Sequence, residues 1–342
     1  MAKDTRRAFL EALDRVSPVL RQAFEEAIAD TANAARASVL EEALARGDVE
    51  FAIQVLVRPE YFAPLDRALD EAFYQGGVFQ LASLPPKRLL TPRGGTLLLR
   101  FDPGMPQAAR VVRETGARLV REVQEEMREA IRVTAQTGLE AGRSPRAVAR
   151  DILGEKRGNG RVGGTLGLTA HQAATVAKAR AELSDPDAMG RYLDRKLRDQ
   201  RHDAKVKRAR AEGRPLAASE VDLIVKNLAA RTLRKRSETI ARTESLGAMN
   251  AGRQEAMAQK IADGSIPAAA VTKVWRSTPS TRTRDTHLAM NGQEVPFDAP
   301  FVSPSGARLM YPGDRSLGAP ADEIVACRCA HQVRVDYAMM AV

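Results

Sequence analysis

The chain is poor in aromatic residues and in cysteine. Only 4% of its 342 residues are Phe, Trp or Tyr, and it has one Trp and two Cys. Two cysteines spaced Cys-x-Cys cannot build a disulfide framework, and a bridge between such near neighbours would be strained, so we expect reduced thiols. The hydrophobic content of 44% suffices for a globular core. Because Ala, Arg, Glu and Leu dominate, the composition predicts a mostly helical protein packed through aliphatic side chains.

Long apolar runs are also missing. No stretch of eighteen apolar residues occurs, and the opening MAKDTRRAFLEALDRV is amphipathic and charged. The sequence therefore predicts no membrane span, no secretory signal and no membrane partner, and we expect a soluble protein made in a cytoplasm.

Acidic residues are fewer than basic ones. The chain has 53 Lys and Arg and 43 Asp and Glu, which gives a formal charge of +10. This excess favours an acidic partner, most commonly nucleic acid.

Helical spacing of apolar residues dominates the first two thirds of the chain. It runs from residue 4 to about 46, with an interruption at Ser17-Pro18 where proline can begin a new helix. Residues 83–106, rich in Pro and Gly, predict a loop with a short strand at residues 97–99. One long amphipathic helix is predicted from Pro106 to about Thr137.

Capping signals predict further helices. Ser144 and Gly154 bound one short helix, and Thr169 begins a second that ends before Pro186, with a glycine-rich loop between them. A third helix is predicted over residues 237–264. It is crowded with Ala, Ser and Gly, so a neighbouring helix can approach it closely.

Two segments are strongly basic. Residues 191–214 hold ten Lys or Arg against four Asp or Glu, and residues 226–238 hold five against one. Such runs are usually solvated helix faces, and the alternative is contact with phosphates. Because aromatics are nearly absent there, any contact should be with the nucleic-acid backbone and independent of sequence. The candidate DNA contacts are Arg195, Lys196, Arg198, Lys205, Lys207, Arg208 and Arg210.

The pattern changes after Gly264. Alternating apolar residues predict strands near residues 271–275 and within residues 331–339, with turns at Asn291-Gly292, Ser305-Gly306 and Pro312-Gly313. We therefore expect an α+β protein whose predominantly helical, elongated body precedes a small β-rich C-terminal domain. The expected divisions are a helical N-terminal arm (1–100), a helical body with the basic segments (101–264) and the β-rich domain (265–342).

The rarest residues cluster in this last region, which holds the single Trp, both Cys and two of the four His. One interpretation is a zinc site formed by His287, Cys327, Cys329 and His331. A second is catalysis, with His287 as acid or base and Arg282 or Arg284 holding a phosphate. A third is a metal-free structural clasp, with His287 contacting a carbonyl or carboxylate and Trp275 as the largest apolar body of the core. We favour the third, and expect the RTRDTH and CRC motifs to lie side by side.

These residues also carry a family resemblance. Trp275, the run RTRDTH with Gly292 after it, Phe301, LMYPGD, CRC and the preceding IARTE helix with Asn250 together resemble the phage head morphogenesis family typified by the F protein of phage Mu. The resemblance covers roughly residues 100–335. The motif residues are Trp275, Arg282, Arg284, Asp285, His287, Gly292, Tyr311, Asp314, Cys327, Arg328 and Cys329.

The resemblance implies a minor head protein of a tailed phage. Such proteins are associated with the portal vertex and act in capsid assembly and in DNA packaging or delivery. The implied location is the virion, at the capsid interior or portal vertex, after synthesis in the bacterial host cytoplasm. The implied partners are the portal protein, the major capsid or scaffold proteins and double-stranded DNA.

We expect no catalytic residue, no metal and no cofactor. The alternative is a DNA-processing or nucleotide-hydrolysing enzyme that uses Arg242, Glu244 and His287. The chain departs from many family members at two positions, Ser280, where an acidic residue is common, and Ala326, where Asn is common. The missing acid removes a candidate metal ligand or catalytic carboxylate, which disfavours the enzyme.

Overall fold

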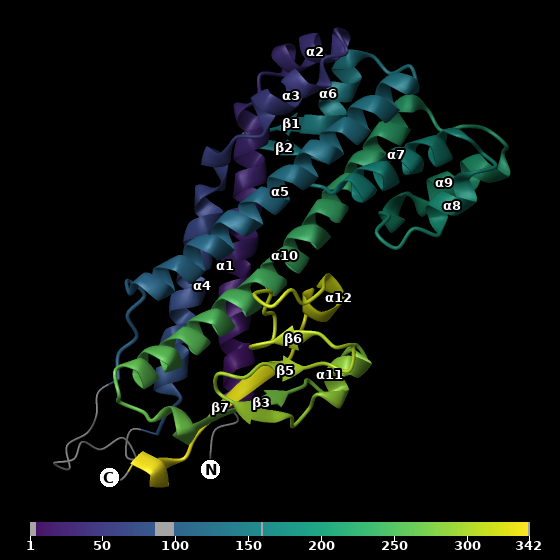
Figure 1. Cartoon of the computed structure of the whole chain (residues 1–342). Coiled ribbons are helices and arrows are strands. Elements are labelled where there is room, and N and C mark those ends of the chain that lie inside the picture. Colours follow the sequence, from purple (N-terminus) through teal and green to yellow (C-terminus); the bar gives the residue numbers. More distant parts are fainter. Residues whose placement is uncertain (1–4, 86–98, 159, 341–342) are drawn as a thin grey trace. The chain divides into compact units, whose positions relative to one another are not determined.

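The computed structural model describes residues 5–85, 99–158 and 160–340 (Figure 1). Its contacts divide the chain into two compact units. The first unit joins three distant stretches of sequence and the second joins two. The first unit comprises Met1–Ala23, Leu65–Ala117 and Glu238–Val342. The second comprises Phe24–Pro64 and Arg118–Ser237. Helices dominate the described chain and its sheets are small and antiparallel, so the predicted α+β class is confirmed.

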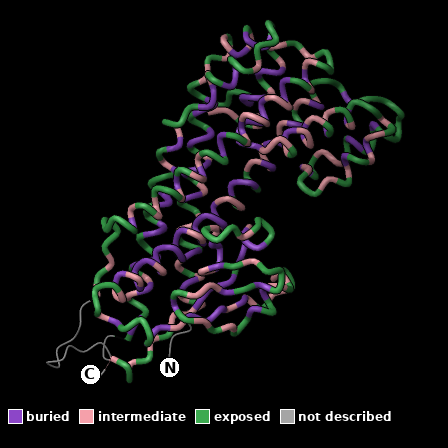
Figure 2. The backbone as a smooth tube through the Cα atoms, viewed as in Figure 1, coloured by how far each residue is buried: buried purple, intermediate pink, exposed green. Residues whose placement is uncertain are grey.

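Three long helices form the main part of the fold. They are α1 (Thr5–Ala34), α5 (Pro106–Glu140) and α10 (Ala218–Ala262). Buried and exposed residues alternate along them, as expected for amphipathic helices (Figure 2). None of the described helices combines the length and the apolar composition needed to span a bilayer.

In the first unit, α4 (Ala63–Ala82) packs closely on the second half of α10. A Cβ atom on Gly252 would lie 1.9 Å from the carbonyl oxygen of Phe73, and one on Gly76 would lie 2.0 Å from that of Met249. The two backbones therefore meet where both helices carry glycine. This confirms the prediction that the small residues of residues 237–264 admit a neighbouring helix.

The C-terminal region of this unit is built around β3 (Val271–Arg276). It pairs antiparallel with β4 (Glu294–Pro296) on one side and with β7 (Ala330–Val335) on the other. A separate two-stranded sheet joins β5 (Phe301–Val302) to β6 (Arg308–Leu309). The short helices α11 (Asp285–Ala289) and α12 (Ala321–Ile324) lie in the connections, with 3-10 turns η4 (Ala268–Ala270) and η5 (Tyr337–Met340) beside the sheet.

The second unit is a helical assembly. A buried apolar cluster, which includes Leu168, Leu183, Tyr192, Val206 and Leu228, joins its later helices to the first half of α10. Besides parts of the long helices, its elements are α2 (Ala37–Ala45), α3 (Val49–Leu56), η1 (Pro59–Phe62), α6 (Pro145–Leu153), β1 (Glu155–Arg157), β2 (Gly160–Val162), α7 (Ala170–Ser184), α8 (Met189–Leu193), η3 (Gln200–His202) and α9 (Asp203–Ala211).

The predicted caps are confirmed. Ser144 Oγ accepts a hydrogen bond from the Ala147 amide at 3.3 Å, and Gly154 ends α6 at a φ of +84°. Thr169 and Gln172 exchange the two hydrogen bonds of a capping box at the start of α7. The glycine-rich loop between these helices differs from expectation, because it folds into the antiparallel hairpin β1–β2.

Two helix boundaries were wrong. Pro18 lies inside α1 and does not begin a new helix, because Leu13 and Leu20 on either side of it are both buried and hold one continuous axis. The helix expected from residue 237 begins at Ala218, because residues 218–236 contain neither proline nor glycine and favour helix. The strand expected at residues 97–99 falls largely outside the described residues.

Candidate functional site

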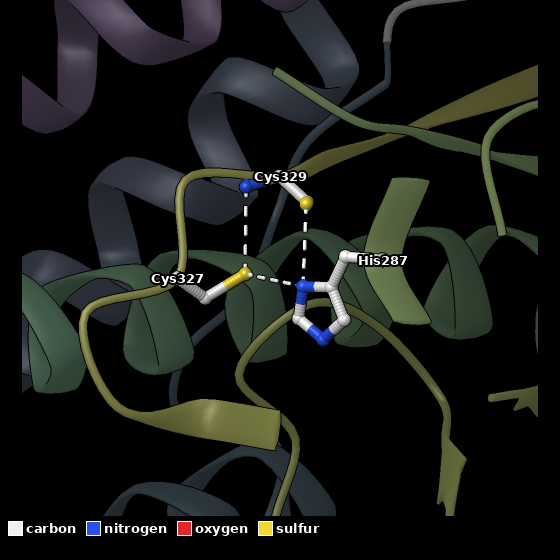
Figure 3. Close-up of side chains that lie close together, drawn as sticks. All are labelled: His287, Cys327 and Cys329. Atoms are coloured by element: carbon white, nitrogen blue, oxygen red, sulfur yellow. Dashed lines mark hydrogen bonds between the residues drawn. The ribbon is translucent and has the colours of Figure 1, made fainter. Parts of the chain in front are cut away.

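The RTRDTH and CRC motifs meet in one buried cluster (Figure 3). His287 Nδ1 lies 3.5 Å from the sulfur of Cys327 and 3.4 Å from that of Cys329. Each of the three side chains is about 1% exposed. His287 comes from α11, and the two cysteines come from the segment that leads into β7. The predicted proximity of the two motifs is therefore confirmed.

Trp275 forms the apolar wall of this cluster. Its side chain is fully buried, and the rings of His287 and Phe301 each meet it edge to face with centroids 5.2 Å apart. Gly292, at a φ of +86°, returns the chain after α11 and donates a backbone hydrogen bond to the Trp275 carbonyl at 2.9 Å. The expected role of Trp275 as the largest apolar body of this core is confirmed.

Glu323 lies on the other side of the His287 ring. Its Oε2 atom is 2.8 Å from His287 Nε2. Burial alone would raise the pKa of Glu323, but hydrogen bonds from Ser305 (2.6 Å) and Ser303 (2.9 Å), together with His287, outweigh burial and lower this pKa. Glu323 is therefore a carboxylate. A His287 contact with a carboxylate was expected, whereas Glu323 itself was missed, because only the fold carries α12 to this ring.

The two thiols differ in acidity. The hydrogen bond that Cys327 gives to Cys329 lowers the pKa of Cys329 to about 5, with His287 adding to the effect. The same hydrogen bond, with burial, raises the pKa of Cys327. The cysteines form no disulfide, in agreement with the expected reduced thiols. Two sulfur atoms and one imidazole therefore face each other away from solvent.

His331 does not join this cluster, which corrects the four-ligand set considered from the sequence. It lies on β7 opposite Trp275, and its ring packs beside Tyr311 with centroids 6.4 Å apart. Burial lowers the pKa of His331 well below its usual range, so the ring is neutral. In the part of the chain that the structure describes, His287, Cys327 and Cys329 are the grouped donors.

The remaining motif residues build the turns around the cluster. Arg284 donates a side-chain hydrogen bond to the Val325 carbonyl, which ties α11 to the segment before CRC. Buried Asp314 accepts from the backbone amides of Met310 at 2.7 Å and Ser316 at 2.8 Å. Arg282, Asp285 and Arg328 are exposed. Arg284 is thus engaged with backbone, which does not fit the phosphate-holding role considered for it.

The residues of the alternative enzyme each have a separate partner. Arg242 pairs with Asp14 at 2.7 Å, and Glu244 pairs with Arg315 at 2.9 Å. His287 faces Glu323, as described above. Arg242 and Glu244 point to different sides of α10, and each ties this helix to another element of the first unit.

The candidate DNA contacts fall into two groups. Arg195, Arg198 and Lys205 pair with Glu182 (2.8 Å), Asp203 (3.0 Å) and Glu220 (2.7 Å). The other four are exposed and form no ion pair with any described residue. They are Lys196, Lys207, Arg208 and Arg210. Charge pairing therefore leaves about half of the predicted set available to an external anion.

A cavity in the second unit was not foreseen. Its volume is about 900 Å³, and residues of α5, α6, α7 and α10 line it. Arg143 and Arg180 pair with Asp151 and Asp222 on its wall. Burial raises the pKa of Asp151, while Asp222, also partly buried, has its pKa lowered by Arg180 and Arg143. No sequence pattern predicts this network, because its members come from α6, α7, α10 and the turn between α5 and α6.

Comparison with known families gives one finding. Residues 204–332 match the family described as Phage Mu protein F like protein. The matched range begins in α9 and ends in β7, so it contains the His287, Cys327 and Cys329 cluster. Searches of curated proteins and of solved structures returned no significant match. This family points to a phage head or head morphogenesis protein. The resemblance read from the motifs is thus confirmed over residues 204–332, a phage Mu protein F-like region, whereas residues 100–203 of the expected extent lie outside the match.

Proposed function

We propose that this protein is a minor head protein that associates with the portal vertex and acts in head assembly and in DNA packaging or delivery. The observation that carries the proposal is the match of residues 204–332 to the phage Mu protein F-like family. The other proposed partners are the major capsid or scaffold proteins. The protein acts by binding, without turnover, and without a catalytic role for His287.

Contact with packaged DNA is part of the proposal. Lys207, Arg208 and Arg210 lie on α9, and Lys196 precedes it, and all four are exposed without a carboxylate partner among the described residues. The segment between Lys196 and Arg210 contains no Phe, Trp or Tyr. Binding should therefore be to phosphates, independent of sequence, and strongly dependent on salt, because each contact releases condensed counterions.

A salt titration tests the DNA contact. Full-length protein is titrated against duplexes of unrelated sequence at several salt concentrations, beside the variant Lys207→Glu/Arg208→Glu. The wild type should bind all duplexes alike, and the variant should lower the slope of log affinity against log salt by about 2, since each lost contact contributes about 0.9.

The control reverses Lys156 and Arg157, two exposed residues of β1, and makes the same change in net charge. If the control lowers the slope as much as the α9 variant, overall charge and not α9 is responsible. Binding that resists molar salt, or no binding at low salt, refutes phosphate contact by these residues.

Portal association is tested by co-expression with the portal protein encoded in the same phage genome. The expected result is a complex that survives affinity purification and size exclusion. If the two proteins separate at every salt concentration, portal association is wrong, while the head-protein assignment stays supported by the family match.

The absence of turnover has its own test. Plasmid and linear DNA are incubated with the purified protein, with and without divalent metal. Intact DNA is the expected outcome. Cleavage that disappears in Arg242→Ala or Glu244→Ala would instead favour the DNA-processing enzyme.

A further inference from the structure

We propose that His287, Cys327 and Cys329 bind a zinc ion. Zinc in proteins takes nitrogen and sulfur donors at about 2.0–2.1 Å and 2.3 Å in tetrahedral geometry, which sets the N···S edge at about 3.5 Å. The Nδ1 atom of His287 lies 3.5 Å and 3.4 Å from the two sulfur atoms. All three donor atoms lie within 4.8 Å of one another. The side chains therefore already hold the spacing of three zinc ligands.

The surroundings of His287 match those of a metal-bound histidine. A ligating imidazole usually shares its second nitrogen with a carboxylate, which fixes the tautomer and the ring orientation. Glu323 Oε2 lies 2.8 Å from Nε2, and Ser303, Ser305 and Thr286 hold this carboxylate in place. With the proton on Nε2, the lone pair of Nδ1 points at the two sulfur atoms (Figure 3).

A metal-free clasp accounts less well for the same geometry. Nδ1 has one lone pair, so it accepts a hydrogen bond from one thiol at a time. Both sulfur atoms nevertheless sit at nearly equal distances from it. A metal ion between the three atoms satisfies all of them together. From the sequence the metal-free clasp was favoured over zinc, because Cys-x-Cys-x-His is not the usual zinc-ligand spacing and two ligands at i and i+2 form an uncommon, tight chelate.

The site joins three separate segments. His287 comes from α11, the cysteines precede β7, and Glu323 comes from α12. Hydrogen bonds already link these segments, from Arg284 to the Val325 carbonyl and from Thr286 to Glu323, and a metal ion would add a further cross-link among them. The three ligands are about 1% exposed, so the site is closed to bulk solvent, and the protein supplies three of the four tetrahedral positions.

Metal content is the first test. Full-length protein, purified without a metal-binding tag, is analysed by mass spectrometry for bound metals, beside His287→Gln and Cys327→Ser. The expected result is about one zinc per chain in the wild type and at most about a tenth of that in the variants. The control is His171→Gln, which makes the same change at an exposed histidine on α7 and should keep its zinc.

A second measurement covers variants that fail to fold. Wild-type protein is unfolded in chelator and refolded with or without zinc alone, and its thermal melt is recorded. Zinc should raise the melting temperature, since metal-binding free energy adds to folding free energy. Cobalt added in its place should give the strong absorption of sulfur-to-cobalt charge transfer, lost in Cys329→Ser.

Three outcomes overturn the proposal. They are wild-type protein without zinc whose melt zinc does not change, zinc content equal in wild type and His287→Gln, and a different metal held in the cluster. None of them depends on the role of the protein in the phage head, so the zinc site and the proposed function fail or stand separately.

Discussion

Arg253 Nη2 donates a hydrogen bond to the main-chain oxygen of His331 at 2.9 Å, although the two residues are 78 positions apart. The guanidinium is about 1% exposed and also donates to Gln80 and Asn250, each at 3.1 Å. It lies over the ring of Phe9 at 4.7 Å. Burial lowers the pKa of Arg253 to about 9, so it stays charged at neutral pH. One side chain therefore joins α10 to α1, α4 and β7.

Replacing Arg253 with methionine should destabilise the protein. The change leaves three buried acceptors without donors, and each orphaned group costs about 1–3 kcal/mol. We expect a loss of at least about 3 kcal/mol in the free energy of unfolding, measured in urea. Arg282→Met, at an exposed arginine, should change it by less than about 0.5 kcal/mol. Equal losses in the two variants would refute the role assigned to Arg253.

Gly252→Ala tests the close approach of α4 and α10. Its new Cβ would meet the Phe73 carbonyl at 1.9 Å, and backbone cannot move aside as a flexible side chain can. The expected loss is more than about 2 kcal/mol in the same urea measurement. Gly190→Ala is the matched control, because its Cβ would meet only the mobile end of Arg210, at 3.4 Å. That variant should be neutral or up to about 1 kcal/mol more stable.

Trp275→Ala should cost about 3–5 kcal/mol, since it removes a fully buried aromatic side chain and leaves a cavity between His287 and Phe301. Unfolding in urea, followed by circular dichroism, measures this loss without relying on tryptophan fluorescence. Leu288→Ala on α11, where the side chain is 43% exposed, should cost less than about 1 kcal/mol. A small effect of the Trp275 change would mean that this core tolerates the cavity by collapsing.

Lys273 gives a pH-dependent prediction. Its Nζ atom is buried, donates to the Met310 carbonyl at 2.8 Å and lies over the rings of Phe297 and Phe301. Burial lowers its pKa to about 8, below the usual 10.5. Below pH 8 both folded and unfolded chains carry the proton, and the burial cost is fully present. Between pH 8 and about 10.5 only the unfolded chain keeps it, so the folded state gains stability as pH rises.

The comparison variant is Lys273→Met, which lacks this proton. From pH 7 to about 10.5, the stability of the wild type relative to Lys273→Met should rise by about 3 kcal/mol. Urea unfolding at half-unit pH steps measures the difference, with Lys178→Met as the control for losing one charge. Parallel curves for wild type and Lys273→Met would contradict the prediction.

Ala326 is the non-glycine residue with positive φ among the described residues, at +54°. Its amide donates to Thr243 Oγ1 at 2.9 Å, which fixes the segment before CRC on α10. A left-handed conformation costs an ordinary residue about 1–2 kcal/mol, and asparagine tolerates it better. Ala326→Asn should therefore raise the stability by about 0.5–1 kcal/mol, and Ala326→Val should lower it by a similar amount. The melting temperatures of the two variants and the wild type measure these changes. A valine variant as stable as the asparagine variant would refute the argument.

Much of the helical structure was determined by local sequence. The caps at Ser144 and Thr169 and the long amphipathic α5 depend on side chains within a few residues, so composition and spacing predict them. The same holds for the small residues of α10, whose close packing requires only that no Cβ intervene. The family motifs and the pairing of RTRDTH with CRC also followed from the sequence, because rare residues gather where one site needs them.

Tertiary structure decided what involves partners distant in sequence. Pro18 stays inside α1 because buried neighbours on both sides offset one lost hydrogen bond, which no local rule anticipates. Glu323 replaces His331 in the cluster around His287, because strand register turns His331 toward Tyr311 while α12 brings the carboxylate. Acidic neighbours that the fold brings close likewise decided which predicted DNA contacts remain free. Sequence sets each residue's chemistry, whereas only the folded chain sets the distances at which that chemistry acts.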